Sequence, residues 1–232
     1  MCKVSVCCKQ QTGTFKISLK NLKNTLAILG KYYMGMELKI PENFFVGAAM
    51  SGPQTEGAYK TGGRLESIWD TWSDLSISDF YNKVGSYVGN NFYEKYEDDI
   101  KLLKSLHMDS FRTSMQWSRL LTKDGKLNQE GAQFYHKVCK CAKENQIELF
   151  MNLYHFDMPT YLFERGGWES RDVVEAYAAY ARAAFREFGS EIRYWFTFNE
   201  PIVEPDQRYR NGFWYPFIKD AKRGMQVQYH LS

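Results

Sequence analysis

Apolar residues recur with a helical period in three stretches, residues 91–106, 129–145 and 169–188. Apolar positions spaced three and four apart lie on one face of an α-helix. Asn128 and Ser170 stand where the second and third helices would begin, and both residue types are common at helix N-caps. The pattern therefore predicts three amphipathic helices. The stripe of the first consists of Phe92, Tyr96, Ile100, Leu103 and Leu106.

Short apolar runs at residues 43–49, 108–117, 147–156 and 191–201 separate these helices. They are short and rich in aromatic and aliphatic residues, as is typical of buried strands. Strands that alternate with helices at this spacing indicate βα units and a parallel sheet. The sequence thus predicts an α/β protein.

Polar side chains follow or end each of the four predicted strands. In a parallel α/β barrel the C-terminal ends of the strands form the active site. Polar groups gathered there from four separate strands indicate a catalytic or binding site. In chain order they are Gln54, Glu56, Arg112, His155, Asp157, Asn199 and Glu200.

The fourth strand carries the most informative stretch, YWFTFNEP at residues 194–201. Its aromatic residues are typical of a strand buried on both faces. Pro201 cannot donate to a sheet and favours an extended residue before it, so the strand should stop with Glu200 extended at its rim. Partial burial among aromatic residues would raise the pKa of Glu200, as suits a general acid. Taken alone, Asn-Glu-Pro is equally typical of a turn.

Composition and charge narrow the function classes. Of the 232 residues 44% are hydrophobic, which is typical of a globular protein with a large core. The net charge of +3 comes from six lysines in residues 1–36, which contain no acid; the remainder has 24 basic and 27 acidic residues. The charge therefore does not indicate nucleic-acid binding.

Five cysteines show neither a zinc-binding spacing nor a disulfide framework, so we expect no metal, no cofactor and a reducing compartment. No apolar run approaches the roughly 20 residues of a membrane span. We therefore expect a cytoplasmic protein without a membrane partner. Residues 1–35 are rich in Lys and Cys and lack a steady period, and we expect a non-domain basic N-terminal extension there. Residues 36–232 are expected to form the domain, with Met36 a plausible initiator.

From about residue 40 onward the chain resembles the N-terminal half of family 1 glycoside hydrolases, the β-glucosidase and 6-phospho-β-glucosidase group. This resemblance implies a TIM (β/α)8 barrel, of which residues 36–232 would form about the first four βα units. The matching segments are FFVGAAMSGPQTEGAYK (44–60), SIWDTWS (67–73), FRTSMQWSRL (111–120), LYHFDMPTYL (153–162), GGWESRDVVEAYAAYA (166–181) and WFTFNEP (195–201).

The resemblance also implies roles for five residues. Glu200 would be the acid/base catalyst, and Asn199 would bind the 2-hydroxyl of the sugar. Gln54 and His155 would bind hydroxyls on the far side of the ring, and Arg112 would lie beneath the site and steady the charge of the nucleophile. Each has a plainer interpretation, as a turn residue, a buried core histidine or an internal ion-pair partner.

Four neighbouring residues are expected to have supporting roles. Glu56 and Asp157 would brace loops and hydroxyl ligands without exchanging protons. Trp69 and Trp72 would pack in the interior and not against the sugar.

The motifs HFDMP, SGPQTEG and WYP (214–216) are similar to those of 6-phospho-β-glucosidases, which cleave phosphorylated disaccharides or aryl glucosides. We therefore expect a small, 6-phosphorylated β-glucoside as substrate. In this family the phosphate-binding residues lie beyond the position of Ser232. A β-glucosidase acting on unphosphorylated β-glucosides is the first alternative.

The family's nucleophile is a Glu in a TENG-like motif, and this sequence contains no such motif. We therefore expect Glu200 to lack its partner carboxyl in this chain. Four strands without the rest of a barrel leave open edges, so self-association through those edges is also expected. An inactive, truncated remnant that at most binds sugar is the second alternative.

Overall fold

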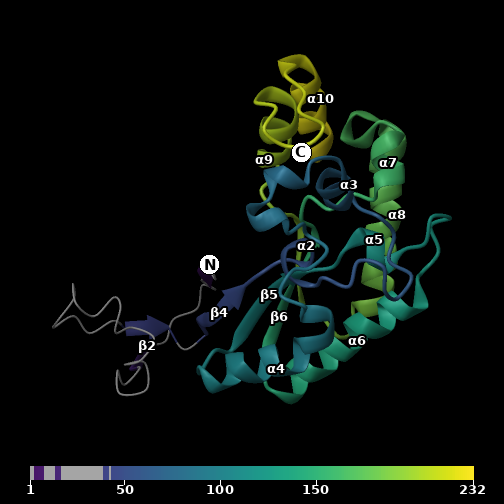
Figure 1. The fold of residues 1–232 in the computed structure, drawn as a ribbon. Helices are drawn as coiled ribbons and strands as arrows, with labels where there is room; N and C mark the ends of the chain where they lie inside the picture. Colours follow the sequence, from purple (N-terminus) through teal and green to yellow (C-terminus); the bar gives the residue numbers. More distant parts are fainter. Residues whose placement is uncertain (1–2, 8–13, 17–38, 42) are drawn as a thin grey trace.

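The computed structural model describes residues 3–7, 14–16, 39–41 and 43–232 (Figure 1). A five-stranded sheet has the order β1-β4-β5-β6-β7, and β2 pairs with β3 in a separate sheet. Strands β4 to β7 pair in parallel, with helices in each connection. The predicted α/β class is confirmed. The strands are β1 (Lys3–Cys7), β2 (Thr14–Lys16), β3 (Lys39–Pro41), β4 (Phe45–Ala49), β5 (Ser110–Ser114), β6 (Glu148–Tyr154) and β7 (Tyr194–Phe198).

Three long helices occupy the connections between the parallel strands, and in Figure 1 they lie on one side of the sheet. They are α4 (Phe92–Ser105), α6 (Gln129–Glu144) and α8 (Arg171–Phe188), and each falls within the range predicted from the apolar period. The remaining helices are α2 (Gly52–Thr55), α3 (Ile68–Leu75), α5 (Trp117–Leu120), α7 (Thr160–Glu164), α9 (Val203–Pro205) and α10 (Ala221–Leu231), with single turns at Ile77–Asp79, Tyr81–Lys83, Gly167–Glu169 and Asp206–Arg210.

Some local expectations for these helices are wrong. Leu106 lies beyond the end of α4 and is 45% exposed, so it does not belong to the buried stripe. Asn128 and Ser170 occupy the N-cap positions, but neither side chain caps its helix. The Nδ2 group of Asn128 instead donates to the backbone oxygens of Gly62, in a loop, and Arg119, in α5, and so joins these two segments.

The expectation that β7 is buried on both faces is also wrong. Phe196 is 37% exposed, and Thr197 is exposed as well. The reason is the position of β7, which is the last strand of the sheet and pairs within the described part of the chain with β6 alone. An aromatic strand that suits burial on both faces is therefore partly exposed on both, because Phe196 and Thr197 point to opposite faces.

Strand β1 lies in the segment that the sequence placed outside the domain. It pairs antiparallel with β4, from Lys3 opposite Ala49 to Cys7 opposite Phe45. Most of the remaining N-terminal segment, including Met36, lies outside the described residues.

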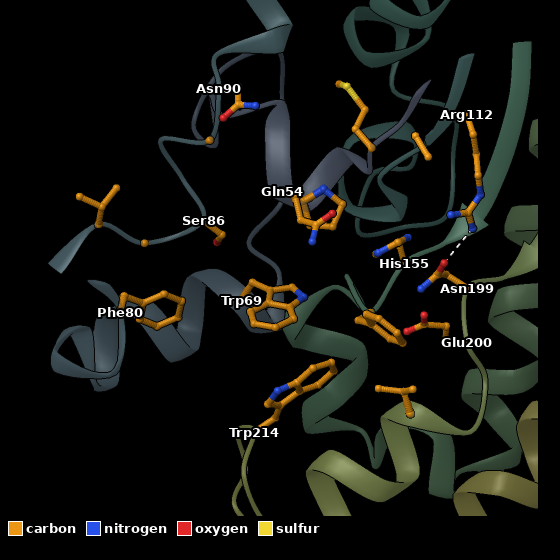
Figure 2. Close-up of a pocket in the computed structure, with 18 residues that line it drawn as sticks. Gln54, Trp69, Phe80, Ser86, Asn90, Arg112, His155, Asn199, Glu200 and Trp214 are labelled. Carbon is orange, nitrogen blue, oxygen red and sulfur yellow. Dashed lines mark hydrogen bonds between the residues drawn. The ribbon is translucent and has the colours of Figure 1, made fainter. Parts of the chain in front are cut away.

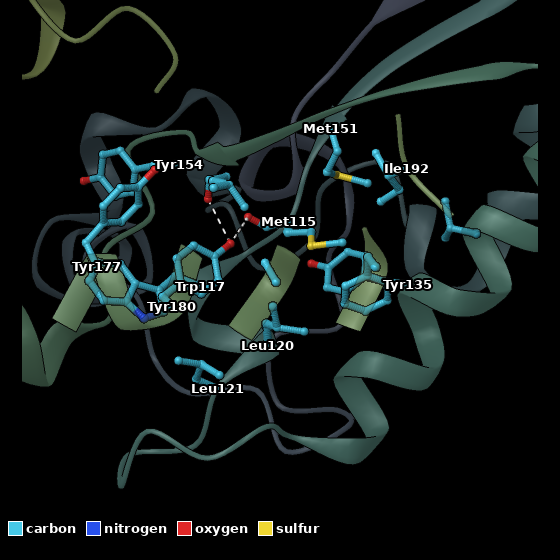
Figure 3. Packing of buried hydrophobic residues seen from close by; sticks show 14 of the residues in the cluster. Met115, Trp117, Leu120, Leu121, Tyr135, Met151, Tyr154, Tyr177, Tyr180 and Ile192 are labelled. Atoms are coloured by element: carbon cyan, nitrogen blue, oxygen red, sulfur yellow. Dashed lines mark hydrogen bonds between the residues drawn. The ribbon is translucent and has the colours of Figure 1, made fainter. Parts of the chain in front are cut away.

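The core lies between the sheet and the helices (Figure 3). The ring of Trp117, at the start of α5, stacks on that of Tyr180 in α8, with centroids 5.2 Å apart. The hydroxyl of Tyr180 lies 3.3 Å from the backbone oxygen of Met115 and 2.9 Å from that of Leu153. One buried side chain thus ties α8 to the C-terminal ends of β5 and β6, where polar residues gather. No helix in the described ranges is long and apolar enough to cross a membrane.

Candidate active site

A cavity of about 750 Å³ lies at the C-terminal ends of the parallel strands (Figure 2). All five residues predicted for the site line it, namely Gln54, Arg112, His155, Asn199 and Glu200. They come from four segments that are far apart in the sequence and that the parallel sheet brings to one edge. The structure therefore brings the five predicted residues together at one cavity.

Arg112 and Asn199 form a direct hydrogen bond across the floor of the cavity. Nη2 of Arg112, in β5, donates to Oδ1 of Asn199 at 2.8 Å. This contact fixes the amide orientation of Asn199 and leaves its Nδ2 group available to donate to a ligand. Partial burial lowers the pKa of Arg112, and the charge of Glu200 nearby opposes that effect. Arg112 is therefore a cation held close to the carboxylate of the cavity.

His155 follows β6 and is largely enclosed. Burial, together with the positive charge of Arg112, lowers its pKa to about 3, so the imidazole is neutral at neutral pH. Its Nδ1 atom is buried and has no hydrogen-bond partner among the described residues. Buried polar atoms are rarely left unpaired in folded proteins. A neutral ring with an unpaired nitrogen at a cavity wall is suited to a hydroxyl ligand, unlike a satisfied core histidine.

Gln54 lies in α2, directly after Pro53, and its side chain is exposed to the cavity. Its Oε1 atom accepts a hydrogen bond from the hydroxyl of Ser51 at 2.7 Å. The amide nitrogen is therefore the group left to donate towards a ligand.

Glu200 differs from expectation in two respects. Its side chain is exposed and not partly buried, because the edge strand β7 leaves this side of the cavity open. Its φ angle is +45°, so the residue before Pro201 is not extended. The chain turns at once after β7, where the amide of Val203 donates to the carbonyl of Glu200 at 2.9 Å. A positive φ is uncommon for a residue with a Cβ, and such strain is frequent at functional sites.

Glu56 and Asp157 lie behind the cavity, fully buried, and hold loops as predicted. The carboxylate of Glu56 pairs with Arg119 at 2.7 Å. The carboxylate of Asp157 accepts hydrogen bonds from the backbone amides of Trp117, at 3.1 Å, and His155, at 3.0 Å. Burial raises the pKa of Asp157 to about 7, against the effect of these hydrogen bonds. Asp157 thereby fixes the backbone that presents His155.

An aromatic wall of the cavity was not predicted as part of the site. Trp69 packs against Trp72, with ring centroids 5.3 Å apart, as predicted, and it also lines the cavity, which the sequence did not predict. Trp214 lines it too, 5.3 Å from Trp69 and 5.2 Å from Phe156 between ring centroids. The one signal in the sequence for this wall was Trp214 itself, the first residue of the WYP motif, in the loop that follows the last strand.

The charges of the cavity set a limit on its chemistry. Among the described residues that line it, Glu200 is the one carboxylate and Arg112 the one permanent cation. Hydrolysis with retention at a sugar requires two carboxyl groups about 5–5.5 Å apart. The described residues that line the cavity thus offer one acid/base group, hydroxyl ligands and an aromatic wall, but no second carboxyl.

The family model and the similar proteins all indicate the same family. The model of glycosyl hydrolase family 1 matches residues 36–232. A 6-phospho-β-glucosidase, GmuD of Bacillus subtilis, is 42% identical over 195 residues, which are 84% of this chain and 42% of that protein. β-Glucosidase A of Acetivibrio thermocellus is 35% identical over 196 residues, 84% of this chain and 44% of that protein.

Among solved structures, a β-glucosidase from Thermotoga maritima in complex with cyclophellitol superposes with a TM-score of 0.79 at 30% identity, covering 83% of this chain and 44% of that one. The four parallel strands β4 to β7 and the helices that follow them therefore correspond to the first four βα units of a (β/α)8 barrel. The chain spans less than half the length of the relatives named here.

Proposed function

Because the chain belongs to glycosyl hydrolase family 1, we propose that the protein hydrolyses β-glucosidic bonds with retention, using Glu200 as acid/base catalyst. One observation carries this proposal. Glu200, the hydrogen-bonded pair of Arg112 and Asn199, and the unpaired Nδ1 of His155 meet at one cavity. A carboxyl group beside an array of hydroxyl ligands supplies one of the two carboxyls that retaining hydrolysis of a sugar requires, together with the groups that bind the sugar ring.

In this mechanism Glu200 donates a proton to the departing glycosidic oxygen and later accepts one from the attacking water. The amide of Asn199, oriented by Arg112, donates to the 2-hydroxyl of the sugar. Gln54 and His155 hold the hydroxyls on the far side of the ring. The nucleophilic carboxyl would come from residues outside the described cavity lining, with the cation of Arg112 available to stabilise its charge.

We propose a 6-phosphorylated β-glucoside as the substrate, and with it a cytoplasmic enzyme. The support is the likeness to the 6-phospho-β-glucosidase of Bacillus subtilis at 42% identity. Arg112 already serves Asn199, so the phosphate receptor would be supplied by residues outside the described cavity. The likeness to proteins named β-glucosidase favours an unphosphorylated substrate as the second candidate.

The test is hydrolysis of 4-nitrophenyl 6-phospho-β-glucoside and of its unphosphorylated twin. Each is assayed with the purified chain, alone and mixed with the C-terminal half of the Bacillus subtilis relative. Turnover in the mixture that Glu200→Gln abolishes supports the proposal, and the preferred substrate separates the two candidates. A mixture that forms a complex and turns over neither substrate contradicts catalysis. Calorimetric titration with glucose then tells whether the chain only binds sugar.

A further inference from the structure

A buried ion pair lies directly behind the aromatic wall of the cavity. Nε of Arg208 and Oε1 of Glu204 are 3.1 Å apart, and both side chains are almost completely buried. Glu204 follows the proposed acid/base Glu200 by four residues. The hydroxyl of Tyr154, at the end of β6, donates to the same Oε1 atom at 2.9 Å. The pair therefore joins the segment after Glu200 to the strand that leads to His155.

The guanidinium of Arg208 makes four further contacts, two with backbone oxygens and two with aromatic rings. Its Nη2 group donates to the backbone oxygen of Phe156 at 3.2 Å, and its Nη1 group donates to that of Tyr215. Its central carbon lies 5.6 Å from the ring centre of Trp69 and 5.4 Å from that of Trp214. Both distances are within the range of a cation–π contact. One side chain thus holds both tryptophans and the two loops that carry the wall.

Stability alone is a poor explanation for this pair. Removing two charges from water costs several kcal/mol per ion, and apolar residues of similar volume are often at least as stabilising. An apolar residue could not replace Arg here in one respect. The guanidinium is planar and has N–H donors in fixed directions, so it can hold two carbonyls and lie against two rings. The contacts of Arg208 use all of these directions.

We propose that Arg208 is a positioning residue, which sets the orientation of Trp69 and Trp214 so that they form the wall against which the leaving group lies beside Glu200. The statement that a leaving group lies against this wall rests on the proposed glycosidase function. The positioning itself can be tested without any activity. Arg208 does not line the cavity, so it acts through the two tryptophans and the backbone of Phe156.

A matched control exists elsewhere in the molecule. Arg119 is equally buried and paired with Glu56 at 2.7 Å. It also donates to backbone oxygens, including that of Gly57, and lies over the rings of Tyr93 and Phe134. Neither Arg119 nor those two rings line the cavity. Loss of Arg119 should therefore lower stability in the same way without moving the wall.

The experiment uses the whole 232-residue chain labelled with 5-fluorotryptophan, whose six ¹⁹F resonances are assigned by single Trp→Phe variants. Arg208→Lys keeps the charge but loses the fork, and it should shift or broaden the Trp69 and Trp214 resonances. Arg119→Lys should leave both in place. If Arg208→Lys lowers the unfolding temperature as Arg119→Lys does and leaves both resonances unchanged, the positioning role is overturned.

Two further measurements complete the test. Should Arg208→Lys fail to melt cooperatively, Glu204→Gln weakens the anchor at Nε, and unchanged resonances in that variant overturn the proposal equally. Titration with a non-hydrolysable 4-nitrophenyl thioglucoside, in its 6-phosphorylated and unphosphorylated forms, should shift the Trp214 resonance with at least one form. Binding of that form should be about tenfold weaker in Arg208→Lys, a difference of about 1.4 kcal/mol. A wild-type chain that binds neither form, while Arg208→Lys still shifts both resonances, contradicts the proposed function and not the positioning.

Discussion

The backbone amide of His155 donates to the carboxylate of Asp157 at 3.0 Å, and the two side chains have pKa values displaced in opposite directions. Burial and the charge of Arg112 lower the pKa of His155 to about 3, from 6.5. Burial raises the pKa of Asp157 to about 7, from 3.8. One short segment thus carries two buried groups that are both mostly neutral in mildly acidic solution.

These displacements predict opposing effects of pH on stability. As pH falls from 6.5 towards 3, the unfolded chain protonates His155 and the folded chain does not, so the free energy of unfolding falls. Between pH 7 and 3.8 the folded chain retains a proton on Asp157 that the unfolded chain has lost, so this group stabilises the fold as pH falls. Each effect amounts to about 1.4 kcal/mol per pH unit, and they largely cancel.

Single variants should separate the two effects. His155→Asn should become more stable relative to wild type as pH falls from 6.5 to about 4. Asp157→Asn should become less stable relative to wild type over the same range. Urea unfolding at a series of pH values measures both, and parallel curves for the two variants would contradict the assignment.

The positive φ angle of Glu200 predicts a variant that gains stability while losing activity. Glycine adopts φ values near +45° without the steric cost of a Cβ, so Glu200→Gly should raise the free energy of unfolding by about 1 kcal/mol. Glu200→Ala keeps the Cβ and is the matched control. Thermal unfolding compares them, and a Gly variant no more stable than the Ala variant shows that the backbone is not strained.

His136 predicts a loss of stability at alkaline pH. Its Nδ1 and Nε2 atoms lie 2.6 Å from Glu191 and 2.9 Å from Glu187, and an imidazole donates from both nitrogens only when it is protonated. Partial burial lowers the pKa of His136, but the two carboxylates outweigh it and the pKa is raised. The contribution is present below pH 6.5 and disappears as pH rises through the raised pKa.

The measurement is thermal unfolding of wild type and His136→Gln between pH 6 and pH 9. Wild type should lose up to about 1 kcal/mol more than the variant across this range, because the pair is partly exposed. An identical pH dependence of the two proteins would show that folding leaves the pKa of His136 unchanged.

The open edge at β7 predicts self-association. The ring of Phe150 stacks on those of Tyr194 and Phe196, with centroids 4.7 Å and 6.3 Å away, and Phe196 is 37% exposed. An exposed apolar strand with unpaired backbone groups is a template for pairing with another chain. Sedimentation velocity should show oligomers that Phe196→Lys reduces. Phe213→Lys, at a loop residue that is 68% exposed, should change nothing, and an equal effect of both variants would point to general surface apolarity.

Periodicity predicted α4, α6, α8 and the parallel strands because those elements are covered by neighbours close in the chain. Periodicity wrongly predicted burial of Phe196 and Leu106, because Phe196 lies in the last strand of the sheet and Leu106 lies beyond the end of α4. The positive φ angle of Glu200 could not be predicted from the sequence either, because Pro201 restricts the conformation of the residue before it without determining the direction of the turn.

The polar residues of the site could be found because they follow strands, and parallel strands end at one edge. The buried pair of Glu204 and Arg208 could not be predicted from the sequence, since opposite charges four residues apart usually lie on the solvent-exposed face of a helix. Nor could Trp69, because a tryptophan that packs in a core and one that lines a cavity have the same sequence pattern. Only the three-dimensional structure, in which Trp69 lines the cavity, distinguishes them.

The described residues that line the cavity all come from one uninterrupted stretch, from Ala49 to Trp214. A genetic crossover anywhere outside that stretch would pass this part of the pocket on whole. The acid/base candidate, the hydroxyl ligands and the aromatic wall would therefore be inherited as a unit. Recombination could then exchange whatever faces them without disturbing a single contact within the set.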